Sequence, residues 1–169
     1  MTLQPVPQVE VVLASRDQQP ILANLLQLYI YDFSELLDLD AGPDGLFVYP
    51  HLPLYWSDPG RHPFLATVDG KLAGFVLVKP GSQASSHDMA EFFVLRRYRR
   101  RGVGSRIAHE VWVRLPGRWE VRVMEANAAA QRFWARAIAS FTGSPAVPGR
   151  IERDGEWWQL FSFDSSSRT

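Results

Sequence analysis

The sequence predicts a single mixed α/β domain in which helices flank a twisted, mostly antiparallel sheet of about seven strands. The chain has 169 residues, which suits one domain with a full core. Short β-type runs alternate with stretches that have apolar residues at helical spacing. Two Asp-Gly pairs, at residues 69–70 and 154–155, join neighbouring runs as tight hairpins. We expect one domain over residues 1–169, with its core at about 8–163 and a flexible tail at 164–169.

The first third predicts a strand, a long helix and a loop. Residues 9–14 have the composition of a strand. Ser15 and Gln18 then have the spacing of a capping box, and Pro20 suits the first helical turn. Apolar residues at intervals of three and four extend this helix to about Asp38. Residues 39–62 are rich in proline, glycine and aromatic residues, and a connection of this length is typical of a functional loop.

The remaining elements follow in a regular order. Residues 64–68 and 72–78 predict a hairpin, and 89–95 predict the next strand. A helix begins at Gly102 and ends before Pro116-Gly117. After a strand at 119–124, Asn127 is placed to cap a helix with an apolar face. Residues 150–153 and 156–163 predict a final hairpin.

Composition excludes several classes of function. Basic and acidic residues balance at 18 each, which argues against a dedicated nucleic-acid binder. The absence of cysteine excludes disulfides, a cysteine nucleophile and thiolate metal sites. No histidine pair has metal-ligand spacing, so no metal is expected. The N-terminus does not resemble a signal peptide, and no apolar run is long enough for a membrane helix. We therefore expect a cytoplasmic protein without membrane partners.

The most unusual stretch places five arginines in residues 96–101, directly before Gly102 and Gly104. This cluster could bind nucleic acid, could be a solvated loop, or could hold a cofactor that carries phosphate. A strand, a glycine turn and a helix form a general anion site, because the first helical N–H groups lack partners. The Walker pattern is absent, and Ile107 occupies the position where a dinucleotide fingerprint needs a third glycine.

Two segments resemble the GNAT superfamily of acetyl-CoA-dependent N-acetyltransferases. The first, Arg99-Arg100-Arg101-Gly102-Val103-Gly104, resembles the family's Q/R-x-x-G-x-G/A signature after its fourth strand. The second is WEVRVMEAN followed by AAAQRFW, a strand, an asparagine and an aromatic helix. The resemblance covers about residues 8–163, and the segments YIYDFSE, EFFVLRRYRRRGVG and PGRWEV are similar to a bacterial branch of predicted acetyltransferases. It implies splayed central strands and transfer of an acetyl group from acetyl-CoA to an amine.

The resemblance also implies which residues bind the cofactor. Backbone amides from Arg100 to Ser105 would bind the pyrophosphate of coenzyme A. Val94 and its neighbours would lie beside the pantetheine arm, with a strand N–H near Val94 polarising the acetyl carbonyl. Asn127 would contact the cofactor near this arm. The full set of expected cofactor-binding residues is Phe93, Val94, Arg99, Arg100, Arg101, Gly102, Val103, Gly104, Ser105, Asn127 and Phe133.

Proton transfer needs a base near the thioester. Glu91 is the favoured candidate, because apolar neighbours can raise its pKa, and Asp88 is the alternative. Strict alternation places Asp88 and Glu91 on opposite faces of the strand, although a bulge would change this. In the superfamily a tyrosine that follows a phenylalanine often protonates the thiolate. Here Trp134 follows Phe133 and cannot act as an acid, so that role is in doubt.

The acceptor side is less well defined. Tyr31, Asp32 and Glu35 on the first helix are candidates, because acidic and aromatic side chains suit a cationic amine. The acceptor would be a small-molecule or peptide amine, and without cysteine the transfer would be direct. An acyl-CoA sensor or inactive relative is the alternative, motivated by Trp134. A nucleic-acid module built on the arginines is the third hypothesis. Many members of the superfamily dimerise, so a homodimer remains open.

Overall fold

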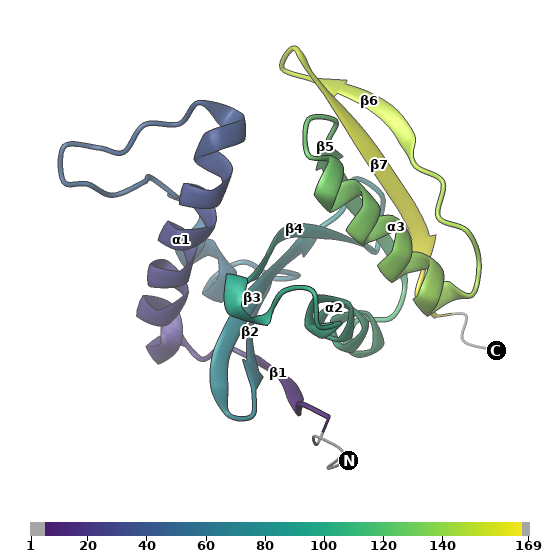
Figure 1. The fold of residues 1–169 in the computed structure, drawn as a ribbon, viewed down its shortest axis with the longest axis horizontal. Coiled ribbons are helices and arrows are strands. Elements are labelled where there is room, and N and C mark those ends of the chain that lie inside the picture. Colours follow the sequence, from purple (N-terminus) through teal and green to yellow (C-terminus); the bar gives the residue numbers. More distant parts are fainter. Residues whose placement is uncertain (1–5, 167–169) are drawn as a thin grey trace.

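The computed structural model describes residues 6–166, which form a seven-stranded sheet and three α-helices (Figure 1). The strands are β1 (Val9–Leu13), β2 (His62–Val68), β3 (Lys71–Pro80), β4 (Ser86–Val94), β5 (Arg118–Met124), β6 (Gly149–Arg153) and β7 (Glu156–Asp164). The helices are α1 (Gln19–Leu37), α2 (Val103–Arg114) and α3 (Ala128–Thr142). Three short 3₁₀ helices complete the fold, η1 (Arg16–Gln18), η2 (Leu52–Trp56) and η3 (Arg96–Tyr98). The predicted mixed, mostly antiparallel sheet is confirmed.

The sheet has the order β1-β2-β3-β4-β5-β7-β6, and every neighbouring pair is antiparallel except β4 and β5. That parallel pair is joined at three positions, from Ser86 opposite Arg118 to Asp88 opposite Glu120. The two strands then continue to Val94 and Met124 and separate. The separation is the predicted splay, and it opens the middle of the sheet.

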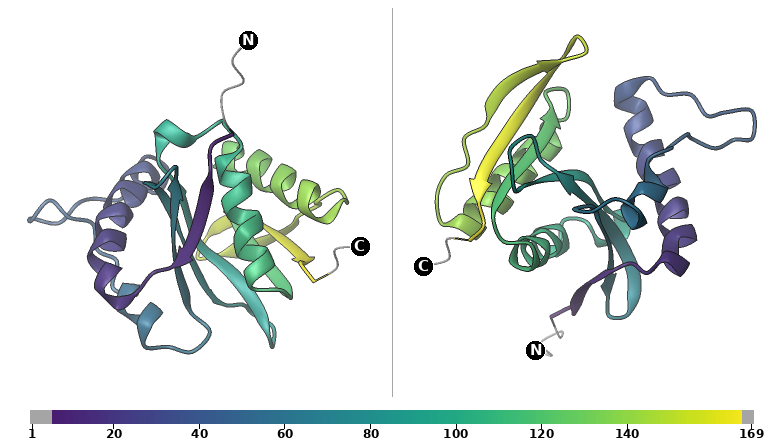
Figure 2. Two further views of the ribbon diagram at one scale, coloured as in Figure 1. Left: turned by 90° about the horizontal axis from the view of Figure 1, so that it is seen from below. Right: turned by 180° about the vertical axis from the view of Figure 1, so that it is seen from behind.

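The helices cover the two faces of the sheet unequally (Figures 1 and 2). On one face α1 packs through Leu22, Leu25 and Leu26 against β2 and β3. On the other face α2 and α3 bury a larger cluster that includes Ile107, Trp112 and Trp134. Burial of apolar area on both faces is the main stabilising term for such a layered domain. None of the helices in the described part of the chain is sufficiently long and apolar to span a bilayer.

Four details differ from the sequence-based expectations. The loop at 39–62 contains η2, whose Tyr55 is buried, and β4 begins at Ser86 rather than Met89. The backbone at 86–88 lacks a strong apolar pattern, and pairing with β5 makes it a strand. The expected flexible tail was placed too early, since Asp164 belongs to β7 and Ser165 is buried with hydrogen bonds to Gly117 and Trp112. Residues 167–169 of that tail lie outside the described residues. The strict alternation on β4 is also wrong, as described below.

Candidate active site

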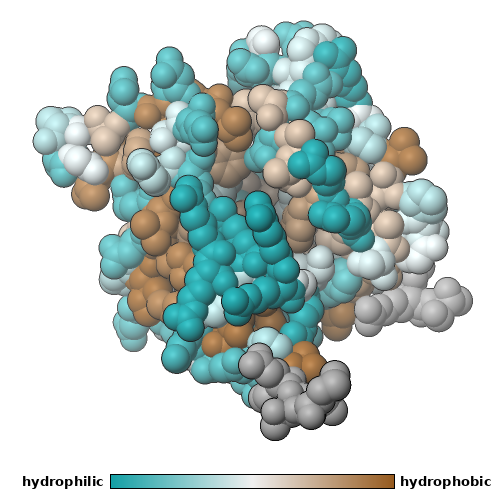
Figure 3. All heavy atoms as spheres, in the orientation of Figure 1, coloured by the Kyte–Doolittle hydropathy of each residue, from teal (hydrophilic) through white to brown (hydrophobic). Residues whose placement is uncertain are grey.

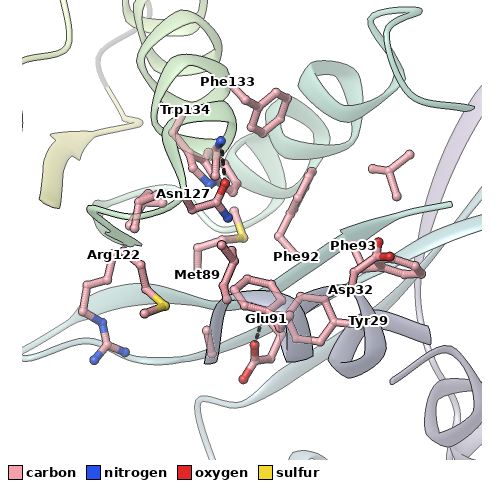
Figure 4. Close-up of a pocket in the computed structure, with 18 of the residues that line it drawn as sticks. Tyr29, Asp32, Met89, Glu91, Phe92, Phe93, Arg122, Asn127, Phe133 and Trp134 are labelled. Atoms are coloured by element: carbon pink, nitrogen blue, oxygen red, sulfur yellow. Dashed lines mark hydrogen bonds between the residues drawn. The ribbon is translucent and has the colours of Figure 1, made fainter. Parts of the chain in front are cut away.

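A cleft of about 1460 Å³ occupies the opening between β4 and β5. Its walls come from α1, the loop after α1 with η2, β3, β4, the glycine turn, β5, α3 and the β6–β7 hairpin. Because the strands have separated there, the cleft connects the α1 face of the sheet with the face covered by α2 and α3. We call these two parts the α1 half and the α2/α3 half. Figure 4 shows Phe92, Phe133 and Trp134 on one side of β4 and Glu91 with Tyr29 on the other.

The glycine turn begins the α2/α3 half. Arg100 and Gly102 both have left-handed backbone conformations, with φ of 62° and 73°. A Cβ at position 102 would meet no atom within 4 Å, so the backbone angle and not space favours glycine there. Arg100, Gly102, Gly104 and Ser105 line the cleft next to the first turn of α2. Arg101 is exposed and Val103 is buried in the core, and neither lines the cleft.

Gly104 serves a packing role that the sequence pattern did not reveal. A Cβ at this position would lie 3.0 Å from Cε2 and 3.2 Å from Cζ of Phe133. The absence of a side chain therefore allows the first turn of α2 to approach α3. Phe133 in turn packs on Phe92, with ring centroids 5.6 Å apart. Gly104, Phe92 and Phe133 thus fix the position of the helix N-terminus relative to the apolar wall of the cleft.

The arginines before the turn divide into two groups. The Nε of Arg99 donates to the carbonyl oxygen of Val94 at 2.7 Å, and its Nη2 donates to Asp32 at 2.6 Å. Arg96 binds the second oxygen of Asp32 at 2.6 Å. Arg97, Arg100 and Arg101 are exposed. Figure 3 shows the hydrophilic surface that results over the connection between β4 and α2.

Asp32 therefore joins α1 to the end of β4. Burial alone would raise its pKa, but the guanidinium groups of Arg99 and Arg96 outweigh this and hold the pKa below its ordinary value. Its carboxylate is already engaged by two cations, which differs from the expectation that it contacts an acceptor. Glu35 lines the cleft and is exposed, whereas Tyr31 is 64% exposed and is not among the lining residues.

Glu91 lies at the floor of the α1 half. Tyr29 from α1 donates a hydrogen bond to its Oε2, and Tyr49 from the loop after α1 donates to its Oε1 at 3.2 Å. Burial raises the pKa of Glu91 and exceeds the opposing effect of these two hydrogen bonds. Burial and the nearby carboxylate also raise the pKa of Tyr55 to about 12 and that of Tyr29 well above its ordinary value. The site therefore keeps its phenols protonated and holds the pKa of one carboxyl group above its ordinary value.

The sequence pattern did not reveal the roles of Tyr29 and Tyr49. Tyr29 falls on the apolar face of its helix, a position that is typical of a core residue. Its ring does pack against Phe75 and Phe93, but its hydroxyl reaches Glu91. Tyr49 lies 42 residues before Glu91 in an irregular loop. A buried tyrosine usually needs a partner for its hydroxyl, which is the signal that could have indicated the contact.

A β-bulge at Ala90 changes the faces of β4. Leu77 is paired with Glu91 but Val78 is paired with Met89, so Ala90 is an extra residue on β4. Asp88 consequently lies on the same face as Glu91, which corrects the prediction from strict alternation. Asp88 is 4% exposed and forms an ion pair with Arg122 of β5 at 2.5 Å. It does not line the cleft, so Glu91 and not Asp88 is the carboxylate that is open to it.

Helix α3 closes the opposite wall. Asn127 caps it as predicted, accepting a hydrogen bond from the N–H of Ala130 at 3.1 Å, and its side chain lines the cleft (Figure 4). Trp134 is 6% exposed and packs against Phe92 and Phe133, with centroids 4.8 and 4.9 Å away. An indole cannot donate a proton as an acid. Trp134 therefore packs in the wall of the cleft and supplies no acid to protonate the thiolate.

The sequence and the fold were both compared with those of known proteins. A model of the acetyltransferase (GNAT) family matches residues 26–138. A search of curated proteins found no match. An acetyltransferase from Thermus thermophilus is structurally similar, with a TM-score of 0.68, 18% identity, and coverage of 94% of this chain and 98% of that one.

Two further solved structures carry specific names. The ribosomal-protein-S18-alanine N-acetyltransferase from Escherichia coli has a TM-score of 0.62 and 15% identity, with 96% and 97% of the two chains covered. An aminoglycoside 6'-N-acetyltransferase complexed with coenzyme A has a TM-score of 0.65 and 12% identity, with 95% and 99% covered. Such low identities show a shared fold, and the family match over residues 26–138 covers most of the chain and most of the residues that line the cleft. The chain therefore belongs to the acetyltransferase (GNAT) family.

Proposed function

We propose that the protein transfers an acetyl group from acetyl-CoA directly to a primary amine of a small molecule or peptide. The observation that carries this proposal is the position of Glu91, a buried carboxyl group with a raised pKa in the same cleft as the glycine turn. Acetyl transfer to amines is general for the family. This reaction needs a base for the amine and a site for the phosphates of the cofactor, and the cleft contains a candidate for each.

The α2/α3 half fits the requirements of coenzyme A. The first N–H groups of α2 would bind the pyrophosphate, and the exposed arginines of the turn add positive charge. Beyond Asp88 the edge of β4 toward β5 has no strand partner in the described part of the chain, so its backbone can pair with an extended arm. Asn127 uses its oxygen to cap α3, which leaves its amide hydrogens to donate into the cleft. The aminoglycoside acetyltransferase with this fold was solved with coenzyme A.

Glu91 would act as the base. The amine nitrogen attacks the thioester carbonyl carbon, and Glu91 takes a proton from that nitrogen directly or through water. The new C–N bond forms, the C–S bond breaks, and coenzyme A leaves as a thiolate that takes a proton from water. A backbone N–H on the open edge of β4 near Val94 would polarise the carbonyl. The bonds of Glu91 to Tyr29 and Tyr49 hold its carboxylate in place during these steps.

Trp134 is the observation that favours a second candidate, an acyl-CoA-binding protein with little turnover. Without an acid side chain to protonate it, a poorly stabilised thiolate leaves more slowly than it would with such an acid. Thiols are nevertheless acidic leaving groups, with an ordinary pKa of about 8.5. The two candidates differ in whether an amine causes release of coenzyme A.

Thermal unfolding with and without acetyl-CoA tests the cofactor site. A ligand at 100 times its Kd stabilises the folded state by about 2.7 kcal/mol, which raises the Tm by roughly 5–10 °C for a chain of this size. Ser105→Glu places a carboxylate at the helix N-terminus and should abolish the shift. Ser144→Glu, at an exposed serine after α3, is the matched control and should retain it. Absence of a shift in the wild type at millimolar acetyl-CoA would refute the proposal, and a shift without amine-dependent release of coenzyme A would favour the second candidate.

A further inference from the structure

A second group of charges lies in the α1 half, where β4 and β5 separate. Arg122 of β5 and Lys79 of β3 both approach Oδ2 of Asp88, at 2.5 and 4.0 Å. Two cations thus share this carboxylate, and the carboxylate of Glu120 on β5, which accepts hydrogen bonds from Ser82, adds a second negative charge nearby. The side chain of Asp88 is 6% exposed, whereas those of Arg122 and Lys79 are 21% and 34% exposed. The two cationic side chains are therefore partly buried but accessible.

Both cations line the cleft on the same side of the sheet as Glu91. Val121 and Val123, the neighbours of Arg122 on β5, belong to the core under α2 and α3. Alternation along the strand then directs Arg122 to the α1 half. Figure 4 shows its guanidinium turned to the same side of the sheet as the Glu91 carboxylate. Among the described residues its Nε is also buried without a hydrogen-bond partner.

The rest of the α1 half does not suit a polycation. Of the acidic side chains contributed by α1, Asp32 is already paired with Arg96 and Arg99. Leu36, Leu39 and Val48 line the same half and are exposed apolar residues. Glu91 is enclosed by two tyrosines. Apart from the exposed Glu35, an acceptor with several positive charges would therefore meet apolar side chains and the cations Arg122 and Lys79.

We propose that the acceptor is a small amine that also carries a carboxylate, as a free amino acid does. Its amine enters at Glu91, and its carboxylate binds Arg122 with support from Lys79. A planar guanidinium matches a carboxylate in two parallel hydrogen bonds, and a partly buried cation makes them stronger than at the surface. The inference rests on the proposed function and specifies its acceptor.

Matched pairs of acceptors test the inference that the acceptor carries a carboxylate. Release of coenzyme A from acetyl-CoA is measured for a panel of free amino acids, each compared with its carboxamide, which keeps the amine and removes the charge. We expect the free acids to have a kcat/KM at least about tenfold above that of the amides, because a lost charged partner usually costs more than that factor. The ratio of acid to amide is the readout, so a general loss of activity does not affect it.

Two variants and one control test whether the acid-to-amide ratio of kcat/KM depends on the charges of Lys79 and Arg122. Lys79→Met should reduce it, and the charge-balanced double variant Arg122→Met with Asp88→Asn should reduce it further, with Lys79 as the one remaining cation of the two. The double variant avoids leaving Asp88 buried without a cation. Arg153→Gln removes an exposed arginine of the β6–β7 hairpin that also lines the cleft, and it should keep the wild-type ratio.

The outcomes separate this inference from the proposed function. If the wild type neither binds acetyl-CoA nor transfers its acetyl group, both fail. If it acetylates amides as well as acids, or if the preference for acids is undiminished in both charge variants, the carboxylate inference is overturned and the acetyltransferase proposal stands. Binding of acetyl-CoA without transfer to any free amino acid of the panel also overturns it.

Discussion

The two halves of the cleft are built in different ways. The α2/α3 half consists of one continuous segment, the glycine turn with the start of α2, closed by aromatic side chains of β4 and α3. The α1 half brings together Tyr29, Tyr49 and Glu91 from a helix, a loop and a strand. The first half presents backbone N–H groups and apolar rings, and the second presents side chains that ionise.

Under the proposed function, this difference separates cofactor binding from catalysis. A backbone cradle at a helix N-terminus has fixed positive partial charges that do not depend on pH. Glu91 by contrast depends on burial and on two phenols for its protonation state. We therefore expect variants in the α1 half to change rates and pH profiles, and variants in the α2/α3 half to change cofactor affinity.

The largest expected effect is on turnover in Glu91→Gln. Loss of the base should reduce kcat by about 10² to 10⁴-fold. The acetyl-CoA-dependent rise in Tm should stay the same, because the variant does not alter the glycine turn. Glu35→Gln, an exposed carboxylate in the same half, is the control for a nonspecific charge effect. Equal kcat in Glu91→Gln and wild type would show that the base lies elsewhere.

Glu91→Gln should also change how the free energy of unfolding depends on pH. Because the folded-state pKa of Glu91 is raised, the folded protein holds its proton over a higher pH range than the unfolded chain does. The stability that Glu91 contributes is complete below the unfolded pKa of about 4.3 and is lost as pH rises through the folded value. Glu91→Gln should remove this loss, so its free energy of unfolding should decline less than that of the wild type as the pH rises above the unfolded pKa of about 4.3. Parallel denaturant curves across this range would contradict the prediction.

A smaller effect is expected from Tyr29→Phe. The hydrogen bond from Tyr29 stabilises the ionised form of Glu91, so its removal should raise the pKa of Glu91 further. The acid limb of the profile of kcat/KM against pH should then move to higher pH, by roughly one unit for a bond of ordinary strength. Tyr31→Phe changes an exposed tyrosine two residues away and should leave the limb in place.

The smallest effect is expected from Asp32→Asn, which removes the ion pairs between α1 and the end of β4. Exposed ion pairs contribute about 0.2–1 kcal/mol each, so the Tm should fall by a few degrees, and less at high salt. Glu35→Gln, one turn further along α1, should change the Tm little. A large increase in the KM of the acceptor with an unchanged Tm would instead support the original interpretation of Asp32 as an acceptor-binding residue.

The sequence by itself determined the order of elements, the glycine turn before α2, the Asn127 cap and the family. Each of these depends on residues that are close together in the chain, where helix periodicity, turn chemistry and capping act over a few residues. Glu91 could also be proposed from its apolar neighbours, since local burial is the main cause of its pKa shift.

Only the tertiary structure decided how the α1 half is assembled. The bulge at Ala90 placed Asp88 and Glu91 on one face, because pairing with β3 accommodates one extra residue on β4. The contacts of Tyr29 and Tyr49 with Glu91, and of Asp32 with Arg96 and Arg99, join residues 42 to 67 positions apart. Local patterns contain no information about such pairs, since they form only when the packing of α1 on the sheet brings the side chains within reach.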